Sequence, residues 1–389
     1  MYDVIVVGVG SMGSAACYFL AKAGAKVLGI EQYGIVHQRG SHSGHTRIIR
    51  KAYFEHPAYV PLLQRAYHNW KELENILNEK IYYRTGLLYI GMEQGPLIKG
   101  LRHSSKTYHI PLIEITTRER EIRYPIFVIP EGHKALLEED AGFLVADRAI
   151  RAYTNEAVKL GAKILTSQKI SGWCQVGNDY EVSVGNESFK SKKLVFTAGA
   201  WTSDLLESNK LPLHATLQTL HWAEGKNHQA FHLDQFPCWV VETPEQQGVY
   251  YGFPIWEDSN LAMPKGLKIA HHHPAIIARV EDELSPDQIR RAESSILEFS
   301  NRYFSNQNLQ ILSTKTCYYN NTPDGHFIID FLPGHDHNVS VACGFSGHGF
   351  KFVSAVGELL ADMIVNQGQM MDKELADLVG MGRFQKFLK

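Results

Sequence analysis

The most constraining feature of the sequence is a glycine-rich hexapeptide, GVGSMG at residues 8–13, between an apolar run and a helix-like stretch. Residues 3–7 are typical of a buried strand, residues 11–22 place apolar side chains at helical spacing, and residues 26–31 resemble a second strand. In such a unit the first glycine makes the turn, the second admits a pyrophosphate and the third allows close packing. The N-terminus is therefore predicted to be a βαβ unit that binds a dinucleotide.

Glu31 ends the second predicted strand, where a carboxylate can accept hydrogen bonds from a ribose diol. No basic residue adjoins Glu31, so a cofactor with a 2′-phosphate is not expected, and FAD and NAD both remain open. Elements typical of a parallel sheet reappear in the sequence after two insertions. This order favours FAD over NAD, because a long cofactor can extend through a domain assembled from separate segments.

Composition limits the partners of this chain. The 389 residues carry a net charge of −2, no long run of basic residues and no long apolar stretch, which predicts neither a nucleic-acid nor a membrane surface. Five cysteines, an odd number without disulfide or metal spacing, suit a reducing compartment. We expect a cytoplasmic protein that binds small molecules.

The order of the predicted elements indicates two types of structure that alternate along the chain. Helix-like and parallel-strand patterns are separated by β-rich stretches, the first of which, residues 81–142, we interpret as an antiparallel insertion. A helix capped by Ser285 and Pro286 lies in the second stretch. The other expected elements are helices at residues 59–77, 147–159 and 350–365, and strands at 163–166, 193–197 and 339–343.

Two loops concentrate groups suited to binding. Residues 40–50, GSHSGHTRIIR, hold several donors with Arg47 and Arg50, and residues 344–351, GFSGHGFK, combine three glycines, a helix start and Lys351. A solvated loop and a plain strand-to-helix turn explain the same residues, with Arg50 and Lys351 in surface ion pairs.

Two further patterns have ordinary explanations. Cys317 is a lone cysteine, and a lone cysteine is usually a small buried hydrophobe. The histidines at 271–273 are consecutive, so on a strand the middle one points away from its neighbours and they cannot converge on one ion. No metal site is predicted.

Longer motifs carry a resemblance to a known family. GVGSMG, GSHSGHTRIIR, FTAGAWTSDLL, YYGFP, GLKIAHHH, CYYNNTPDGHFIID and GFSGHGFKF look like the monomeric sarcosine oxidase family, which includes N-methyltryptophan and pipecolate oxidases. The resemblance spans essentially the whole chain. It implies an α/β fold with a Rossmann-type FAD-binding domain of the glutathione-reductase-like class, interleaved with an α+β substrate domain on a mixed or antiparallel sheet. The implied FAD-binding segments are 1–82, 146–214 and 320–389, and the implied substrate segments are 83–145 and 215–319.

The resemblance also implies roles for residues around an amine. Arg50 and Lys351 would bind the substrate carboxylate, while Tyr251, His272 and Tyr319 would line the amine pocket. Two cations make chemical sense for an amino acid, because fixing the carboxylate sets the α-nitrogen against the flavin.

The same resemblance implies the flavin site. Cys317 would be joined through its sulfur to the 8α carbon of FAD, Arg47 would lie beside the flavin ring, and Lys268 would promote the reaction of reduced flavin with oxygen. The full set of expected cofactor-binding residues is Gly8, Gly10, Ser11, Met12, Gly13, Glu31, Ser41, Thr46, Arg47, Ile170, Gly199, Trp201, Cys317, Gly344, Gly347, His348, Gly349 and Lys351.

The chain departs from the family at one loop, where Ser43 and His45 replace a common histidine and aspartate. The implied reaction is oxidation of a secondary amino acid, such as sarcosine, to an imine that water hydrolyses, with oxygen reduced to hydrogen peroxide by a monomeric enzyme. Alternatives within the family are pipecolate and N-methyltryptophan oxidation. Alternatives from other classes are an NAD-dependent amino or imino acid dehydrogenase and a flavin-binding module without turnover.

Overall fold

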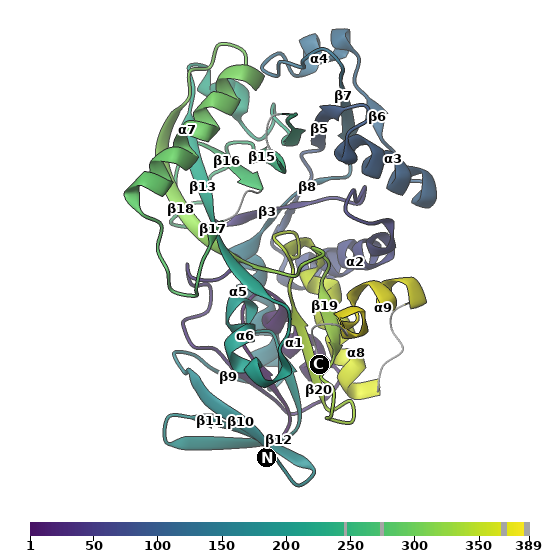
Figure 1. Cartoon of the computed structure of the whole chain (residues 1–389), viewed down its shortest axis with the longest axis vertical. Helices are drawn as coiled ribbons and strands as arrows, with labels where there is room; N and C mark the ends of the chain where they lie inside the picture. Colours follow the sequence, from purple (N-terminus) through teal and green to yellow (C-terminus); the bar gives the residue numbers. More distant parts are fainter. Residues whose placement is uncertain (245–246, 273–275, 367–371, 385–389) are drawn as a thin grey trace.

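The computed structural model describes residues 1–244, 247–272, 276–366 and 372–384. Figure 1 shows two stacked parts, with the N-terminus in the lower one. The lower part holds helices α1 (Ser11–Lys22), α5 (Ala146–Lys159) and α8 (Val353–Asn366) beside strands β12 (Glu187–Phe196) and β20 (Val339–Cys343). The upper part holds α7 (Pro286–Tyr303) and the long strands β13 (His214–Glu224) and β18 (Gln310–Asn321). The chain passes between the two parts several times, as the colours of Figure 1 show.

The lower part is built on a sheet of eight described strands. Its centre runs parallel in the order β9-β2-β1-β12-β20, while β10 and β11 pair antiparallel beside β12, and β19 pairs antiparallel with β20. The strands are β1 Tyr2–Val7, β2 Val27–Ile30, β9 Lys163–Leu165, β10 Ile170–Val176, β11 Asp179–Val184, β12 Glu187–Phe196, β19 Ile328–Phe331 and β20 Val339–Cys343.

Both faces of this sheet are covered, because alternate residues of β1 enter different cores. Val4 and Val6 join the core that holds the helices, whereas Ile5 and Val7 join the core on the opposite face. Helix α8 crosses α1 so closely that a Cβ on Gly357 would lie 2.4 Å from the Cβ of Ala15. The helices of this part are α1 Ser11–Lys22, α2 Val60–Leu77, α5 Ala146–Lys159, α6 Thr202–Leu205, α8 Val353–Asn366 and α9 Lys373–Val379.

The upper part is built on a mixed sheet of nine described strands, in which only β5 and β14 pair in parallel among the described pairs. One face packs on α7 Pro286–Tyr303, whose Phe299 stacks on Trp239 and whose Ile296 is buried in the same core. The strands are β5 Leu87–Met92, β6 Ile113–Glu114, β7 His133–Glu138, β13 His214–Glu224, β14 Cys238–Glu242, β15 Val249–Phe253, β16 Leu267–His272, β17 Ile276–Ile277 and β18 Gln310–Asn321.

A small antiparallel sheet lies where the two parts meet. It consists of β3 Thr46–Ile49, β8 Gly142–Val145 and β4 Tyr82–Tyr83. Strand β3 follows the loop at residues 40–45, and β8 runs directly into α5. The domain boundaries given above stay a prediction.

Most expected elements are present, but residues 81–142 are not simply an antiparallel insertion. They also contain α3 Pro96–Tyr108 and α4 Thr117–Arg123, which the sequence analysis missed. Pro96 occupies the first helical position of α3, where its missing N–H costs nothing. None of the residues of α4 is buried, so the helix has no apolar stripe, and its start is fixed by a capping box between Thr116 and Glu119.

Candidate active site

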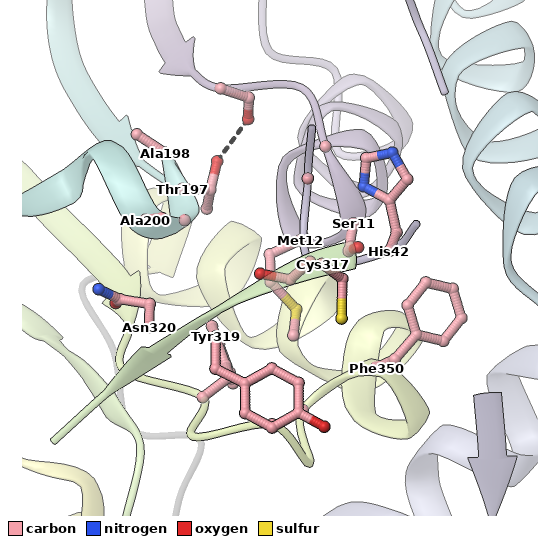
Figure 2. Close-up of a pocket in the computed structure, with 18 of the residues that line it drawn as sticks. Ser11, Met12, His42, Thr197, Ala198, Ala200, Cys317, Tyr319, Asn320 and Phe350 are labelled. Atoms are coloured by element: carbon pink, nitrogen blue, oxygen red, sulfur yellow. Dashed lines mark hydrogen bonds between the residues drawn. The ribbon is translucent and has the colours of Figure 1, made fainter. Parts of the chain in front are cut away.

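A cavity of about 310 Å³ separates the first βαβ turn from strands β16 and β18. That volume is at the lower end of the range for small-molecule sites, roughly 300–1,000 Å³. Figure 2 shows residues of α1, β18 and the loop before β3 around one hollow. Of the expected site residues, all line the cavity except four, namely Gly13, Thr46, Lys268 and Gly344.

The glycine turn has the geometry that the hexapeptide predicts. Gly8 has a φ of +89°, which favours glycine, and a Cβ on Gly13 would lie 1.9 Å from the carbonyl oxygen of Gly8. Gly10 is the N-cap of α1, and no side chain caps the first turn. A Cβ on Gly10 would meet no described atom closer than 4.0 Å. The first N–H groups of α1 therefore remain available to an anion in the cavity.

Glu31 is buried at the end of β2, as expected for a ribose ligand. Its two carboxylate oxygens accept the N–H groups of Val9 at 2.9 Å and Tyr33 at 3.0 Å. Burial raises the pKa of the carboxyl group, and these backbone hydrogen bonds oppose that rise. Each oxygen keeps a lone pair for a further donor.

The loop at residues 41–46 wraps around the guanidinium group of Arg47. That group donates to the carbonyl oxygens of Ser41 at 2.6 Å, Ser43 at 2.5 Å and Thr46 at 2.7 Å. The ammonium group of Lys268 lies behind the same loop, outside the cavity lining. Burial lowers the pKa of Lys268 well below its usual value, and the nearby Arg47 lowers it further.

Cys317 lies on β18 with its side chain among the cavity residues, as Figure 2 shows. It is 2% exposed and packs with Trp222 and Tyr319. Burial raises the pKa of its thiol, while the cations Arg47 and Lys268 lower it. The sulfur is therefore enclosed, and two positive groups partly offset the effect of burial on its pKa.

A histidine and two tyrosines form one wall of the cavity. The hydroxyl of Tyr319 lies 3.2 Å from Nδ1 of His272, and Tyr251 lines the same wall. Burial raises the pKa of Tyr251 to about 12 and that of Tyr319 well above its usual value, so both phenols are neutral at pH 7. Gly347 makes room for this wall, because a Cβ there would lie 2.2 Å from the ring of Tyr319 and 2.6 Å from His272.

Arg50 forms a buried ion pair and not a surface ion pair. Its guanidinium donates to both oxygens of Glu55, at 2.5 and 2.6 Å, and lies over the rings of Tyr53 and Phe54. Burial opposes ionisation of Glu55, but the charge of Arg50 outweighs it and holds the pKa of Glu55 at about 2. Glu55 could not be recognised as a site residue from the sequence, because no motif marks it.

Lys351 is another buried basic residue that lines the cavity. Its ammonium group donates to the carbonyl oxygen of His348 at 2.7 Å, and burial together with Arg50 lowers its pKa to about 7. His348 bonds the hydroxyl of Tyr53 through Nδ1 and the carbonyl of Gly325 through Nε2 at 3.0 Å. Because a carbonyl only accepts, the proton of neutral His348 is on Nε2.

Two polar atoms in the cavity lining are buried without a partner in the described structure: His42 Nε2 and Asn320 Nδ2. Buried polar groups are normally hydrogen-bonded, so both indicate a polar ligand. Together with the open backbone at Gly10, they fit a bound dinucleotide such as FAD. Neither residue was among the predicted site residues, although His42 lies in the motif GSHSGHTRIIR and Asn320 in CYYNNTPDGHFIID.

Other kinds of site have no support in the described part of the chain. There, no group of three or more His, Cys, Asp or Glu side chains is placed to hold a metal ion, and His273 lies outside the described residues. No described helix combines the length and the apolar character needed to cross a membrane.

The fold and the cavity define a dinucleotide-binding oxidoreductase with a Rossmann-type domain and a second sheet over its cofactor site. The FAD dependent oxidoreductase family, DAO, matches residues 3–363, and the chain belongs to this family. The expectation of an FAD enzyme related to sarcosine oxidases is thereby confirmed.

Named relatives of the chain are amino acid oxidases. It is 36% identical over 375 residues to monomeric sarcosine oxidase of Arthrobacter sp., covering 94% of this chain and 92% of that protein. It is 31% identical over 372 residues to N-methyl-L-tryptophan oxidase of Citrobacter koseri, covering 95% and 96%.

Solved structures share the fold at lower identity. NikD, described as an unusual amino acid oxidase essential for nikkomycin biosynthesis, has a TM-score of 0.82 at 20% identity and covers 96% of each chain. L-proline dehydrogenase from P. horikoshii has a TM-score of 0.79 at 21% identity, covering 96% of this chain and 95% of that one.

Proposed function

We propose that the protein is an FAD-dependent oxidase of a small secondary amino acid, sarcosine or a related N-methyl amino acid. The observation that carries this proposal is the pair of buried cations, Arg50 and Lys351, in the cavity that also holds Cys317. Two cations at a fixed site suit the carboxylate of an amino acid. The relatedness to oxidases of sarcosine and N-methyl-L-tryptophan supports the same substrate class.

The chain's own residues suggest how such a substrate is oriented. A carboxylate on Arg50 and Lys351 would place the α-nitrogen near the wall formed by Tyr251, His272 and Tyr319. His272 would accept the proton of the incoming ammonium form, because only a neutral amine can give up electrons. Bound FAD supplies the two-electron oxidation of the C–N bond.

FAD would be held along the cavity from the α1 turn to β18. The first turn of α1 would bind the pyrophosphate and Glu31 the ribose, and we propose a covalent link from Cys317 to the 8α carbon of the flavin. Arg47 and Lys268 would supply positive charge where oxygen is reduced. The overall reaction converts sarcosine, water and oxygen to glycine, formaldehyde and hydrogen peroxide.

A substrate panel with peroxide detection tests this proposal. Sarcosine, N-methyl-L-tryptophan and pipecolate are compared at equal concentration in air, and we expect one peroxide for each imine formed. Pipecolate gives a cyclic imine and no formaldehyde, so formaldehyde detection separates it from the N-methyl substrates. Reduction of NAD by the same substrates would instead indicate a dehydrogenase, and a yellow protein that turns over no substrate would indicate a binding module.

We further propose that the protein is monomeric and cytoplasmic.

A further inference from the structure

Lys268 is held in place by one short turn of the chain. Its ammonium group donates to the carbonyl oxygen of Gly44 at 2.7 Å, the carbonyl oxygen of Thr46 at 2.9 Å and the hydroxyl of Thr46 at 3.1 Å. An ammonium group has three N–H donors, so these bonds use all of them. The place of Nζ therefore depends on the shape of the turn at residues 44–46.

That turn has a conformation that its central residue does not favour. Gly44 and His45 have φ values of +93° and +67°, both in the left-handed region. Glycine adopts this region freely, but a residue with a Cβ is strained there unless contacts hold it. Two backbone bonds support the turn, from Thr46 N to Gly44 O at 2.8 Å and from Ala146 N to His45 O at 2.7 Å.

The imidazole of His45 anchors the turn from the other side. Its Nδ1 lies 2.8 Å from Oδ2 of Asp147, in the first turn of α5, and both side chains are almost fully buried. Nε2 lies 3.5 Å from the ammonium group of Lys315, which can only donate. His45 therefore accepts from Lys315 and donates through Nδ1–H to Asp147.

We propose that His45 is a positioning residue that, by binding Asp147, holds the turn 44–46 and thereby fixes the ammonium group of Lys268. The inference rests on the proposed function, in which Lys268 promotes the reaction of reduced flavin with oxygen. Neither His45 nor Asp147 lines the cavity. We therefore expect loss of the pair to slow the oxygen step much more than the binding and oxidation of the amine.

Separate half-reactions test this role in the flavin-loaded enzyme. In His45→Ala we expect the rate constant of the reduced enzyme with oxygen to fall about tenfold to a hundredfold, as small displacements of an electrostatic group do. The rate of anaerobic flavin reduction by the amine should stay within about twofold. His45→Asn should restore most of the oxygen rate, since asparagine tolerates the left-handed region and its amide can donate to Asp147.

A crystal structure of His45→Ala gives a readout that does not depend on activity. We expect Lys268 Nζ to leave hydrogen-bond distance of Gly44 O, and unchanged contacts would overturn the proposal. Should the single variant not fold, His45→Ala/Asp147→Ala leaves no buried charge unpaired and takes its place. Lys315→Gln is the control, and its oxygen rate should change less than that of His45→Ala.

The outcomes separate this inference from the proposed function. A reduced wild-type enzyme that reacts with oxygen no faster than free flavin contradicts the oxidase itself. If the oxygen rate falls in Lys268→Met but not in His45→Ala, only the positioning role is overturned. An equal loss of both half-reactions in His45→Ala also overturns it, because that result indicates general damage.

Discussion

Both carboxylate oxygens of Glu55 accept hydrogen bonds from the guanidinium group of Arg50, at 2.5 and 2.6 Å, beside the cavity proposed to bind an amino acid. The chain thus supplies its own carboxylate to the cation expected to bind the carboxylate of the substrate. Glu55 neutralises Arg50, which explains how an arginine whose side chain is 4% exposed can be accommodated.

This pair predicts opposite effects of Glu55→Gln on binding and on stability. The variant leaves Arg50 free for an added carboxylate, so the Kd for acetate, measured by flavin absorbance, should fall severalfold. The buried charge of Arg50 is then incompletely paired, and urea unfolding should show a loss of about 3 kcal/mol. Glu93→Gln removes an exposed partner of Arg102 and should cost under about 1 kcal/mol without changing the acetate Kd. Unchanged acetate binding in Glu55→Gln would contradict competition between the two carboxylates.

Lys351 predicts a pH dependence of carboxylate binding. Its pKa of about 7 means that the free enzyme loses this positive charge as pH rises through neutrality. The affinity for acetate should therefore be constant below pH 7 and weaken about tenfold per pH unit above it. Lys351→Arg keeps its charge and should remove the dependence between pH 6 and 9. A wild-type profile as flat as that of the arginine variant would argue against Lys351 as a ligand.

The same pKa also predicts a stability effect of known sign. The unfolded chain holds the Lys351 proton up to its ordinary pKa, whereas the folded chain releases it near pH 7. Between these values the unfolded state binds more protons, so this residue makes the protein more stable as pH rises. Subtracting the profile of Lys351→Met from that of wild type isolates the contribution. A difference that does not change with pH would show that burial leaves this lysine unperturbed.

Cys317 is predicted to hold the flavin covalently. Wild-type protein precipitated with acid should stay yellow, and Cys317→Ser should release its flavin into the supernatant while keeping the fold. Cys174 is exposed, so Cys174→Ser serves as the matched control and should stay yellow. Acid-stable colour in Cys317→Ser would refute the assignment.

Gly347 is predicted to be required mainly because it has no side chain to clash with the cavity wall, and only in part because of its positive φ. An alanine there is strained at φ +78° and also clashes with Tyr319 and His272. Gly334 has a similar φ of +84°, but an added Cβ meets nothing within 4 Å. Gly347→Ala should thus lose about 1–3 kcal/mol more than Gly334→Ala in urea unfolding, together with substrate turnover. Equal losses, with turnover intact in both, would mean that the wall yields to the added methyl group.

Local patterns predicted much of the fold because they are set by neighbours in sequence. The glycine turn and α1 follow from residues 8–22, and β20 was predicted at its observed bounds. Helix α4 was missed because it buries none of its side chains and so has no apolar period.

The site could be predicted only where a motif carried it. The roles of Cys317, Lys268 and Arg50 came from the resemblance, and the placement of these residues near one cavity could not be predicted from their spacing. The partner of Arg50 is only a few residues away, but Glu55 resembles any exposed glutamate until the loop folds it inward. The contact between His45 and Asp147 could not be predicted either, because the two residues are distant in sequence and meet only when β3 pairs with β8.

Anaerobic titration of the yellow protein with sarcosine, N-methyl-L-tryptophan and pipecolate tests the central claim most directly. We expect at least one of these amines to bleach the flavin band completely. Admission of oxygen should then restore the colour and release one equivalent of hydrogen peroxide. If none of the three amines bleaches the flavin, the protein is not the secondary amino acid oxidase proposed here.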